Sequence, residues 1–503
     1  MYIISAYIIY LIHSTNFKYK WKLTFSMFFA FIYVFLSFIL RKCYYMFEEK
    51  NLQTRNTLYN TNDNKDDNYR LRFAPSPTGE MHVGNLRTAI FNFIFTKQKN
   101  GRFFLRIEDT DIKRSNTIYE TSIKNTLKWM NIKYEPLILR QSERFPLYMK
   151  FAMDLLAKGF LYYCNCNTLD ENTKSCECEK DNFTTGLLRF KIPRNERISF
   201  IDEILGLITV NTNTIENFAI LRSDGSPTYN FCVVIDDVEL KITHVFRGNE
   251  HLYNTFKQIL IYEALNMPMP KFGHFPMING KDGKKLSKRS GDTSVIAYRN
   301  MGVVPEALFN FLIRLGWGHG NDEIFTMEEA IKLFDINRIS PSPAMFDINK
   351  LTYLSGYYLN KNWEKYLPEI ITYIELKLSR SITLHERNQL AALIPEFAKR
   401  AKLINELGDM LLFIFKEFIP KNSENLNKDL LKNIIEVLKE VDYLNWKEAH
   451  LHILFKEKFS NEMKDVCGQI RWGLVNLNFS PSIFLILEVL DKKDSLERLE
   501  SFI

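Results

Sequence analysis

Cysteine is scarce in this chain, with 7 residues in a length of 503. So few cysteines exclude a scaffold built on disulfides. The sequence also has no internal repeats, which argues against a solenoid. The chain also lacks the bias of a disordered or collagen-like protein, because 46% of its residues are hydrophobic and 25% are charged. Basic residues only slightly outnumber acidic ones, and the net charge of +7 mildly favours an anionic partner such as nucleic acid. The length suits about three domains.

The first 69 residues differ from the rest of the chain. Apolar runs at 2–12 and 24–40 are each followed by basic residues, and an Asn-rich polar stretch then leads to Tyr69. This order is typical of a secretory-type leader followed by a second targeting segment. A membrane anchor and an untranslated upstream extension remain alternatives, because the run at 24–40 is at the short edge of a bilayer span.

An α/β pattern begins abruptly after Tyr69. Residues 70–74 predict a short strand, residues 75–85 a turn-rich loop, residues 86–100 a helix and residues 102–111 a second buried strand. Strand, loop, helix and strand in this order form half of a doubly wound nucleotide-binding sheet.

Two later parts of the chain have different patterns. Strand and turn signals resume over residues 220–245, whereas the pattern from Lys361 onward is mostly helical. Helical spacing is clearest at Leu431, Ile434, Ile435, Leu438 and Val441.

Two loops carry residues that suit phosphate. The loop at 75–85 opens a helix, so its backbone N–H groups and the helix dipole favour polyphosphate, and His82 can donate to a phosphate oxygen. No Gly-Lys-Ser/Thr sequence closes this loop, so it is not a Walker loop. The loop at 279–292 is rich in Gly and Lys and could close on a triphosphate. Taken singly, a turn with a surface histidine and a solvated basic loop are the plainer interpretations.

Together the two loops resemble the paired nucleotide-binding motifs of class I aminoacyl-tRNA synthetases, HVGN at 82–85 and KLSKR at 285–289. Six segments, in matching order and spacing, are similar to glutamyl-tRNA synthetase. They are RFAPSPTGEMHVGNLRTAIFN (72–92), LRIEDTD (105–111), DGSPTYNF (224–231), RGNEHLYNT (247–255), LGWGHG (315–320) and SPAMFDINKL (342–351). The similarity continues more weakly to the C-terminus, where residues 468–499 look like the closing segment of the bacterial-type enzyme.

The resemblance implies an α/β fold with a Rossmann-type parallel-sheet catalytic domain, an inserted acceptor-binding domain and a following all-α anticodon-binding domain. The expected boundaries are 1–69 for leader and linker, 70–138 and 220–300 for the catalytic halves, 139–219 for the insertion, 301–360 for a stem-contact region and 361–503 for the helical anticodon-binding region.

The reaction implied by the resemblance is that of a glutamate–tRNA ligase. The α-carboxylate of L-glutamate attacks the α-phosphorus of ATP, diphosphate leaves, and the terminal ribose of tRNA then takes the glutamyl group and releases AMP. Catalysis is positioning and charge stabilisation, with Mg²⁺ on the phosphates. Asp236 and Asp237 look like an acid–base pair, but this reaction needs none.

The glutamate pocket must hold two carboxylates and an ammonium group. Guanidinium groups suit carboxylates because they bind bidentately and stay charged, and by resemblance they are Arg72 and Arg247. Glu108 matches the acid that meets the ammonium group, although an ordinary salt bridge would also explain it. Tyr229 matches a family tyrosine, and Val233 stands where the family has a contact that is sometimes Asn. The expected set is Arg72, Phe73, Ala74, Ser76, Glu108, Tyr229, Val233 and Arg247.

The ATP site implied by the resemblance joins the two loops, with His82, Lys285 and Lys288 as the catalytic residues. Asn249 departs from the family pattern, because RGNEH stands where RGEEH is common. The expected ATP-binding set is His82, Gly84, Asn85, Glu250, Lys285, Leu286, Ser287, Lys288 and Arg289.

Four cysteines, Cys164, Cys166, Cys176 and Cys178, form a CxC-x9-CxC cluster in a polar segment. Four thiolates can hold a tetrahedral Zn²⁺ and fix a loop that has no core of its own. Bacterial glutamyl enzymes resemble the first CxC only, so the fourth ligand is an extrapolation. Free thiols and two disulfides remain the alternatives to this structural zinc site.

The expected partners are tRNA-Glu, L-glutamate and ATP, with a monomeric mature chain that is not in a membrane. Rival hypotheses are a shortened relative that glutamylates a modified tRNA base, a non-catalytic tRNA-binding scaffold, and a membrane protein with a soluble tail. Chain length argues against the first, and the intact residues of both loops argue against the second.

The leader on a bacterial-type enzyme suggests import into an organelle of bacterial descent. Together with abundant Asn, Lys and Ile, it resembles proteins sent through the secretory route to an apicoplast or other plastid, with the mitochondrion as the alternative. Organellar enzymes of this kind often charge tRNA-Gln too, so this tRNA is a second expected partner.

Overall fold

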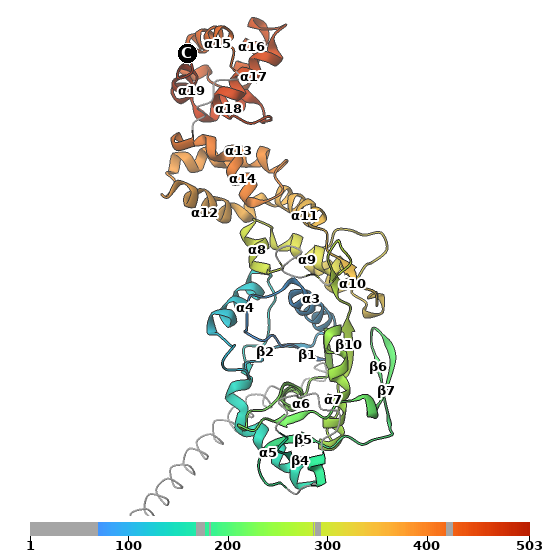
Figure 1. The fold of residues 1–503 in the computed structure, drawn as a ribbon. Helices are drawn as coiled ribbons and strands as arrows, with labels where there is room; N and C mark the ends of the chain where they lie inside the picture. Colours follow the sequence, from blue (N-terminus) through green and yellow to red (C-terminus); the bar gives the residue numbers. More distant parts are fainter. Residues whose placement is uncertain (1–68, 167–176, 181–182, 285, 287–292, 419–425) are drawn as a thin grey trace, which may run out of the picture. The chain divides into compact units, whose positions relative to one another are not determined.

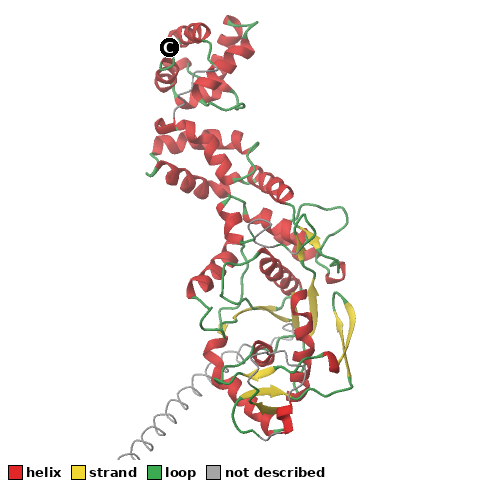
Figure 2. Cartoon of the chain, viewed as in Figure 1, coloured by secondary structure: helices red, strands yellow, loops and turns green. Residues whose placement is uncertain are grey.

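The computed structural model describes residues 69–166, 177–180, 183–284, 286, 293–418 and 426–503. The predicted leader lies outside these residues except for Tyr69. Residues Asn68–Ile503 form one compact unit, and its helices and strands are shown in Figures 1 and 2. Within the described ranges, we find no helix with the length and apolar character needed to cross a bilayer.

A parallel sheet in two parts forms the centre of the fold. Its strands are β1 (Arg70–Phe73), β2 (Arg102–Ile107), β3 (Ile138–Arg140), β6 (Arg197–Asp202), β7 (Gly206–Asn211), β9 (His244–Gly248) and β10 (Lys271–Phe275). One part has the order β1-β2-β3, and the other has the order β7-β6-β10-β9, in which only the β6–β7 hairpin is antiparallel.

The two parts meet between β1 and β9. The Thr243 N–H donates to the Arg70 carbonyl oxygen at 2.9 Å, and Thr243 Oγ1 accepts from the Arg70 N–H at 2.9 Å. β1 therefore has β2 on one side and β9 on the other. In an open α/β sheet such a switch point forms a crevice at the carboxyl ends of the strands, where ligands bind.

Helix α3 (Val83–Gln98) follows β1 and packs on β1, β2 and β9. Most of its residues from Leu86 to Thr96 are buried, so the helix is enclosed on nearly every side. The chain enters β2 through Gly101, where a Cβ would lie 2.2 Å from the Tyr69 carbonyl oxygen. The predicted helix and second strand are confirmed, although α3 begins three residues before the predicted start at residue 86 and β2 ends at Ile107.

The expectation of strand structure over residues 220–245 is wrong in its middle. Helix α6 (Tyr229–Glu239) lies between β8 (Ala219–Leu221) and β9. The apolar run from Phe231 to Ile235 is almost completely buried, and a short apolar run of this kind does not distinguish a buried helix from a buried strand.

The segment predicted as an insertion, 139–219, contributes to two sheets. Helix α5 (Phe145–Ala157) precedes β4 (Leu161–Cys164) and β5 (Leu187–Phe190), which form an antiparallel sheet with β8. The β6–β7 hairpin instead extends the central sheet through β10. The insertion therefore supplies two strands, β6 and β7, to the central sheet, and β6 is the one that pairs with β10.

The remaining described elements are mostly helical. They are α4 (Thr117–Trp129), α7 (Leu252–Leu265), β11 (Ile278–Asn279), α8 (Val295–Asn300), α9 (Pro305–Arg314), α10 (Met327–Leu333), β12 (Ala344–Met345), α11 (Ile348–Lys361), α12 (Leu367–Leu378), α13 (Leu384–Ala398), α14 (Ile404–Leu411), α15 (Lys428–Glu440), α16 (Glu448–Lys458), α17 (Met463–Leu474), α18 (Ile483–Leu490) and α19 (Lys492–Glu500). The helical prediction beyond Lys361 is confirmed, and the apolar residues of α15 at the predicted spacing are buried.

Candidate active site

Two buried arginines lie at the carboxyl ends of neighbouring strands. Arg72 on β1 is 4% exposed and Arg247 on β9 is 5% exposed. Burial raises the pKa of the Tyr229 phenol; the charge of Glu108 adds to this rise, whereas Arg247 and Arg72 oppose it. These four of the eight predicted glutamate-binding residues therefore share one electrostatic environment, and the two arginines lie on neighbouring strands.

A buried chain of charges holds Arg72 and Glu108. Arg72 Nε donates to Asp237 Oδ1 at 3.1 Å, and Arg106, which is fully buried, donates to Asp237 and to Glu108 Oε1, the latter at 3.1 Å. Burial alone would raise the pKa of Asp237, but the charges and hydrogen bonds of Arg106 and Arg72 outweigh it and hold the pKa below its usual value. Burial raises the pKa of Glu108, and the charges of the same two arginines, which lower it, only partly offset this rise.

Arg247 has a different set of partners. Its Nε donates to His274 Nε2 at 3.1 Å and its Nη2 donates to Thr255 Oγ1 at 2.7 Å. The third nitrogen, Nη1, is buried and has no hydrogen-bond partner within the described residues. A buried donor without a partner is costly, so this nitrogen is a candidate donor for a bound carboxylate.

Asp236 is not available for acid–base chemistry. Its two carboxylate oxygens accept hydrogen bonds from Gln141 and Arg144 at 2.8 Å and from Tyr148 at 2.9 Å. The neighbouring Asp237 is occupied by two arginines. The two aspartates therefore tie elements together, in agreement with their rejection as a catalytic pair.

The other predicted glutamate-binding residues differ in how deeply they are buried. Phe73 and Val233 are buried in the core, Ala74 is half-buried, and Ser76 is exposed beyond the end of β1. The Tyr229 hydroxyl lies 3.4 Å from His251 Nδ1, and burial lowers the pKa of His251 to about 4.

The predicted nucleotide loop begins helix α3. His82 is the N-cap, and its Nδ1 accepts from the Gly84 N–H at 2.9 Å. Asn85 is exposed, and its N–H donates to the His82 carbonyl oxygen at 3.0 Å. The α3 N-terminus therefore presents the backbone and dipole features that favour anionic groups.

The lysine-rich loop is anchored beside this turn. The Val83 N–H donates to the Thr293 carbonyl oxygen and the Val295 N–H donates to the Met81 carbonyl oxygen, both at 2.9 Å. At the other end, Leu286 is buried and its N–H donates to the Ile278 carbonyl oxygen at 3.0 Å. Lys285, Ser287, Lys288 and Arg289 lie outside the described residues, so their predicted roles stay predictions.

Glu250 is exposed and folds back over Gly248, where a Cβ would lie 2.3 Å from its Oε2. Only glycine leaves room for this arrangement. The Asn249 Oδ1, at the position that departs from RGEEH, is buried without a hydrogen-bond partner among the described residues.

Sequence reasoning did not single out five residues that support the site: Arg106, Asp202, Thr255 and His274, together with Asp237 in its positioning role. The spacing of Arg106 and Glu108 on one strand face gave a possible signal, because side chains alternate along a strand. The pairing of His274 with Arg247 depends on strand register, which the sequence does not reveal.

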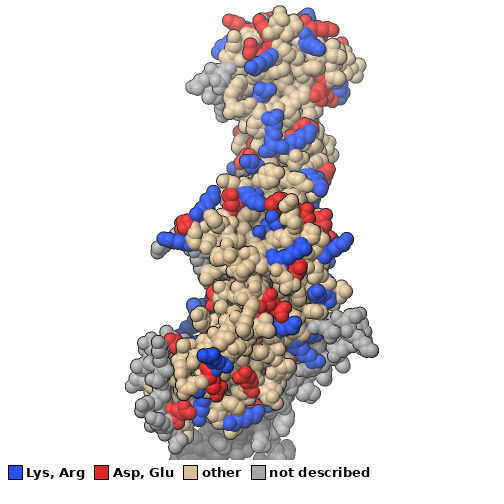
Figure 3. Space-filling model, turned by 90° about the vertical axis from the view of Figure 1, so that its right-hand side faces the viewer, with Lys and Arg blue, Asp and Glu red and all other residues tan. Residues whose placement is uncertain are grey.

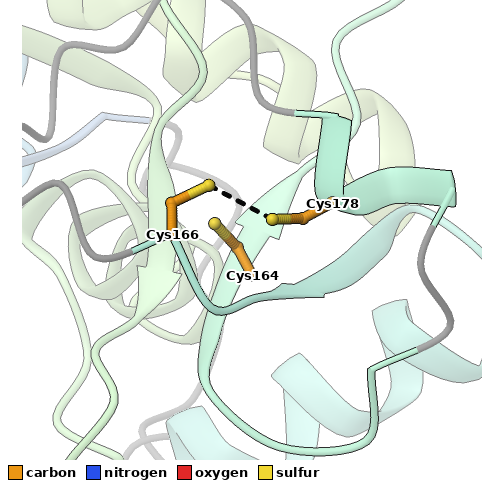
Figure 4. A group of neighbouring side chains, drawn as sticks. All are labelled: Cys164, Cys166 and Cys178. Carbon is orange, nitrogen blue, oxygen red and sulfur yellow. Dashed lines mark hydrogen bonds between the residues drawn. The ribbon is translucent and has the colours of Figure 1, made fainter.

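Three of the four cluster cysteines lie together (Figure 4). Sγ atoms of Cys164, Cys166 and Cys178 are all within 4.8 Å of one another, and Arg189 Nε donates to Cys164 Sγ at 3.3 Å. Sulfurs about 2.3 Å from one tetrahedral zinc lie roughly 3.8 Å apart, so the three thiols fit a zinc site after small shifts. Cys176 lies outside the described residues.

The surface shown in Figure 3 carries basic and acidic side chains interspersed with uncharged ones. This face does not display a broad basic patch of the kind that would identify a nucleic-acid surface by charge alone.

Comparisons with known proteins agree over nearly all of the chain after residue 67. The family model for class I tRNA synthetases (E and Q), catalytic domain, matches residues 68–175 and 168–353, and an anticodon binding domain model matches residues 359–503.

Individual relatives are similar over almost their whole length. "Glutamate--tRNA ligase 2" of Wolbachia sp. subsp. Brugia malayi is 38% identical, with 86% of this chain and 99% of that protein covered. "Glutamate--tRNA ligase 1" of Campylobacter hominis is 40% identical, with 86% and 98% covered. The crystal structure of a glutamate tRNA ligase from Elizabethkingia meningosepticum, in complex with its amino acid, has a TM-score of 0.70 at 28% identity and covers 87% of this chain and 99% of that one.

Proposed function

Since the chain belongs to the glutamate–tRNA ligases of the class I aminoacyl-tRNA synthetases, we propose that its crevice activates L-glutamate with ATP and transfers it to tRNA. The observation that carries this proposal is the pair of buried guanidinium groups, Arg72 and Arg247, at the ends of β1 and β9. One of them keeps a buried nitrogen without a partner, and Glu108 supplies the opposite charge that an ammonium group needs.

The chain's own residues would bind and orient both substrates. Arg72 and Arg247 hold the two carboxylates of glutamate, and Glu108 with Tyr229 faces the amino group. The α3 N-terminus receives the phosphates of ATP, which bring Mg²⁺ with them. This places an α-carboxylate oxygen for attack on the α-phosphorus, so the bond from the α-phosphorus to the leaving diphosphate breaks as the new bond forms. Lys285 and Lys288 of the lysine-rich loop at 279–292 then neutralise charge on the leaving diphosphate.

In the second step the terminal ribose hydroxyl of tRNA attacks the carbonyl carbon of the adenylate, and AMP leaves. The acceptor proposed is tRNA-Glu, and tRNA-Gln is the second acceptor to be tested. The match of residues 359–503 to an anticodon binding domain supports a tRNA partner.

Glutamate-dependent ATP–diphosphate exchange tests this function. The assay compares the chain without tRNA, with tRNA-Glu and with tRNA-Gln, and glutamine replaces glutamate in a control series. We expect exchange only with glutamate and only when a cognate tRNA is present. Exchange supported by glutamine alone, or no exchange with any tRNA, would contradict the proposal.

Structural zinc is proposed for the cysteine cluster, with Cys164, Cys166 and Cys178 as ligands and Cys176 as the fourth. Zinc there would fold the segment and take no part in the reaction. Metal analysis of the purified protein should give about one zinc per chain, and Cys178→Ser should lower this ratio while Cys467→Ser should not. A ratio near zero in the unaltered protein would leave thiols or disulfides as the explanation.

Import into an organelle of bacterial descent is also proposed, with an apicoplast or other plastid first and a mitochondrion as the alternative. The support is the composition of residues 1–69 alone. Fusion of these residues to a fluorescent protein should send it to the organelle, and cytosolic fluorescence would reject the proposal.

A further inference from the structure

His274 and Asp202 lie behind Arg247 on neighbouring strands. His274 on β10 stands directly opposite Arg247 on β9 in the parallel register, and Phe272 on the same strand pairs with Asp202 at the end of β6. His274 is fully buried and Asp202 is 2% exposed. Neither side chain was expected to take part in the site, and neither is within the motifs that define it.

The hydrogen bonds determine where the proton of His274 lies. Arg247 Nε always carries a hydrogen and points at His274 Nε2 at 3.1 Å. Thr255 Oγ1, which already accepts from Arg247 Nη2, lies 3.1 Å from the same nitrogen and can donate its own hydrogen to it. Nε2 is therefore assigned as the acceptor. The proton is therefore on Nδ1, which lies 2.6 Å from Asp202 Oδ2. A proton on Nε2 would set two donors against each other at Arg247.

Asp202 is itself held in place by the backbone. Its Oδ1 accepts from the N–H groups of Ile204 at 3.0 Å, Leu205 at 2.9 Å and His274 at 3.2 Å. Oδ2 is thus directed at the imidazole. A charged carboxylate in this position fixes the ring orientation and the tautomer.

We propose that Asp202 and His274 form a positioning relay that fixes the guanidinium of Arg247, so that its Nη1 faces the crevice as the donor for a substrate carboxylate. Thr255 completes the arrangement by accepting from Nη2. Both residues act through Arg247 and touch no reacting atom. The inference rests on the proposed function, because it concerns how the glutamate carboxylate is recognised.

Asp202→Asn is the sharpest test, because it keeps the shape and replaces an acceptor by a donor. The amide NH₂ would face Nδ1, so the imidazole would move its proton to Nε2 and oppose Arg247. We expect the KM for glutamate to rise by about 10-fold or more, as for loss of a hydrogen bond to a charged group, with little change in the KM for ATP. Glu203→Gln is the matched control, because Glu203 is on the same hairpin and, within the described part of the chain, its carboxylate pairs only with Lys271, at 3.5 Å.

A double-mutant cycle separates the relay from a structural role. In His274→Gln the amide oxygen can accept from Arg247 whatever Asp202 carries, so adding Asp202→Asn to it should change the KM for glutamate little. If Asp202 serves only to fix the β6–β7 turn, the second substitution costs the same in both backgrounds, and that equality would overturn the proposal.

Two further readouts keep the result interpretable. Unaltered protein without glutamate-dependent exchange would reject the proposed function itself, whereas active unaltered protein with an unchanged KM in Asp202→Asn would reject only the relay. Should Asp202→Asn fail to fold, the pair His274→Gln and His274→Leu answers the same question, because only the first keeps an acceptor for Arg247. Equal KM values for glutamate in that pair would overturn the relay.

Discussion

Asp237→Asn should damage both the stability of the catalytic part and its affinity for glutamate. Asp237 is 4% exposed and is the one carboxylate among the described residues that forms ion pairs with both Arg72 and Arg106. Removing one partner of a buried ion pair costs about 3–5 kcal/mol. Asparagine keeps one acceptor oxygen, so we expect the lower end, about 3 kcal/mol, or roughly 6–12 °C in the unfolding midpoint.

The loss of stability in Asp237→Asn should depend on pH in a definite direction. The pKa of Asp237 is held below its usual value by the two arginines. Its charge therefore contributes stability above the ordinary carboxyl pKa, and this contribution is lost as the pH falls through the lowered value. The difference in midpoint between the unaltered protein and Asp237→Asn should be full at pH 7 and shrink only in strong acid.

Asp236→Asn is the matched control, because the adjacent carboxyl is equally buried but bonds to Gln141, Arg144 and Tyr148. Both variants should unfold at lower temperature in a fluorescence-monitored scan. The KM for glutamate in the exchange assay should rise by about 10-fold in Asp237→Asn and far less in Asp236→Asn. Equal changes in KM would refute the reasoning that Asp237 orients Arg72.

Three other changes have definite expected outcomes. Lys288→Ala should lower the exchange rate far more than it weakens ATP binding, and equal losses would count against a role on the developing charge. Burial raises the pKa of Glu108, so its charge is lost as the pH falls through that raised value and the KM for glutamate should climb; Glu108→Gln should lack this acid limb in a pH profile. Gly101→Ala would place a Cβ 2.2 Å from the Tyr69 carbonyl oxygen and should lower the unfolding midpoint, whereas Gly79→Ala, with nothing within 4 Å, should not.

The sequence predicted the local elements around the crevice well, because their signals are local. Turn residues before α3 and Gly101 after it each act within a few residues of the chain, and so does the apolar spacing of α15 in the C-terminal helical region. The two arginines proposed to bind glutamate were found through family motifs. Their chemistry alone would have allowed surface charges on strands.

The sequence could not predict the supporting contacts. His274 and Asp202 meet Arg247 only through the register of three strands, and Asp237 lies on a helix where a strand was expected. A polar residue in an apolar run carries no sign of the partner that will neutralise it. Such partners follow from the packing of distant segments, which periodicity does not encode.

The carboxylate of Asp236 has a mechanical consequence. It sits on the helix that begins with Tyr229. Its hydrogen-bond donors are Gln141 and Arg144, in the turn just before α5, and Tyr148 within α5, the first α-helix of the inserted segment. If α5 moves, α6 must therefore move with it, or the buried ion pair between Arg144 and Asp236 must break. A force on the inserted segment is therefore transmitted to α6, whose first residue, Tyr229, belongs to the proposed glutamate pocket.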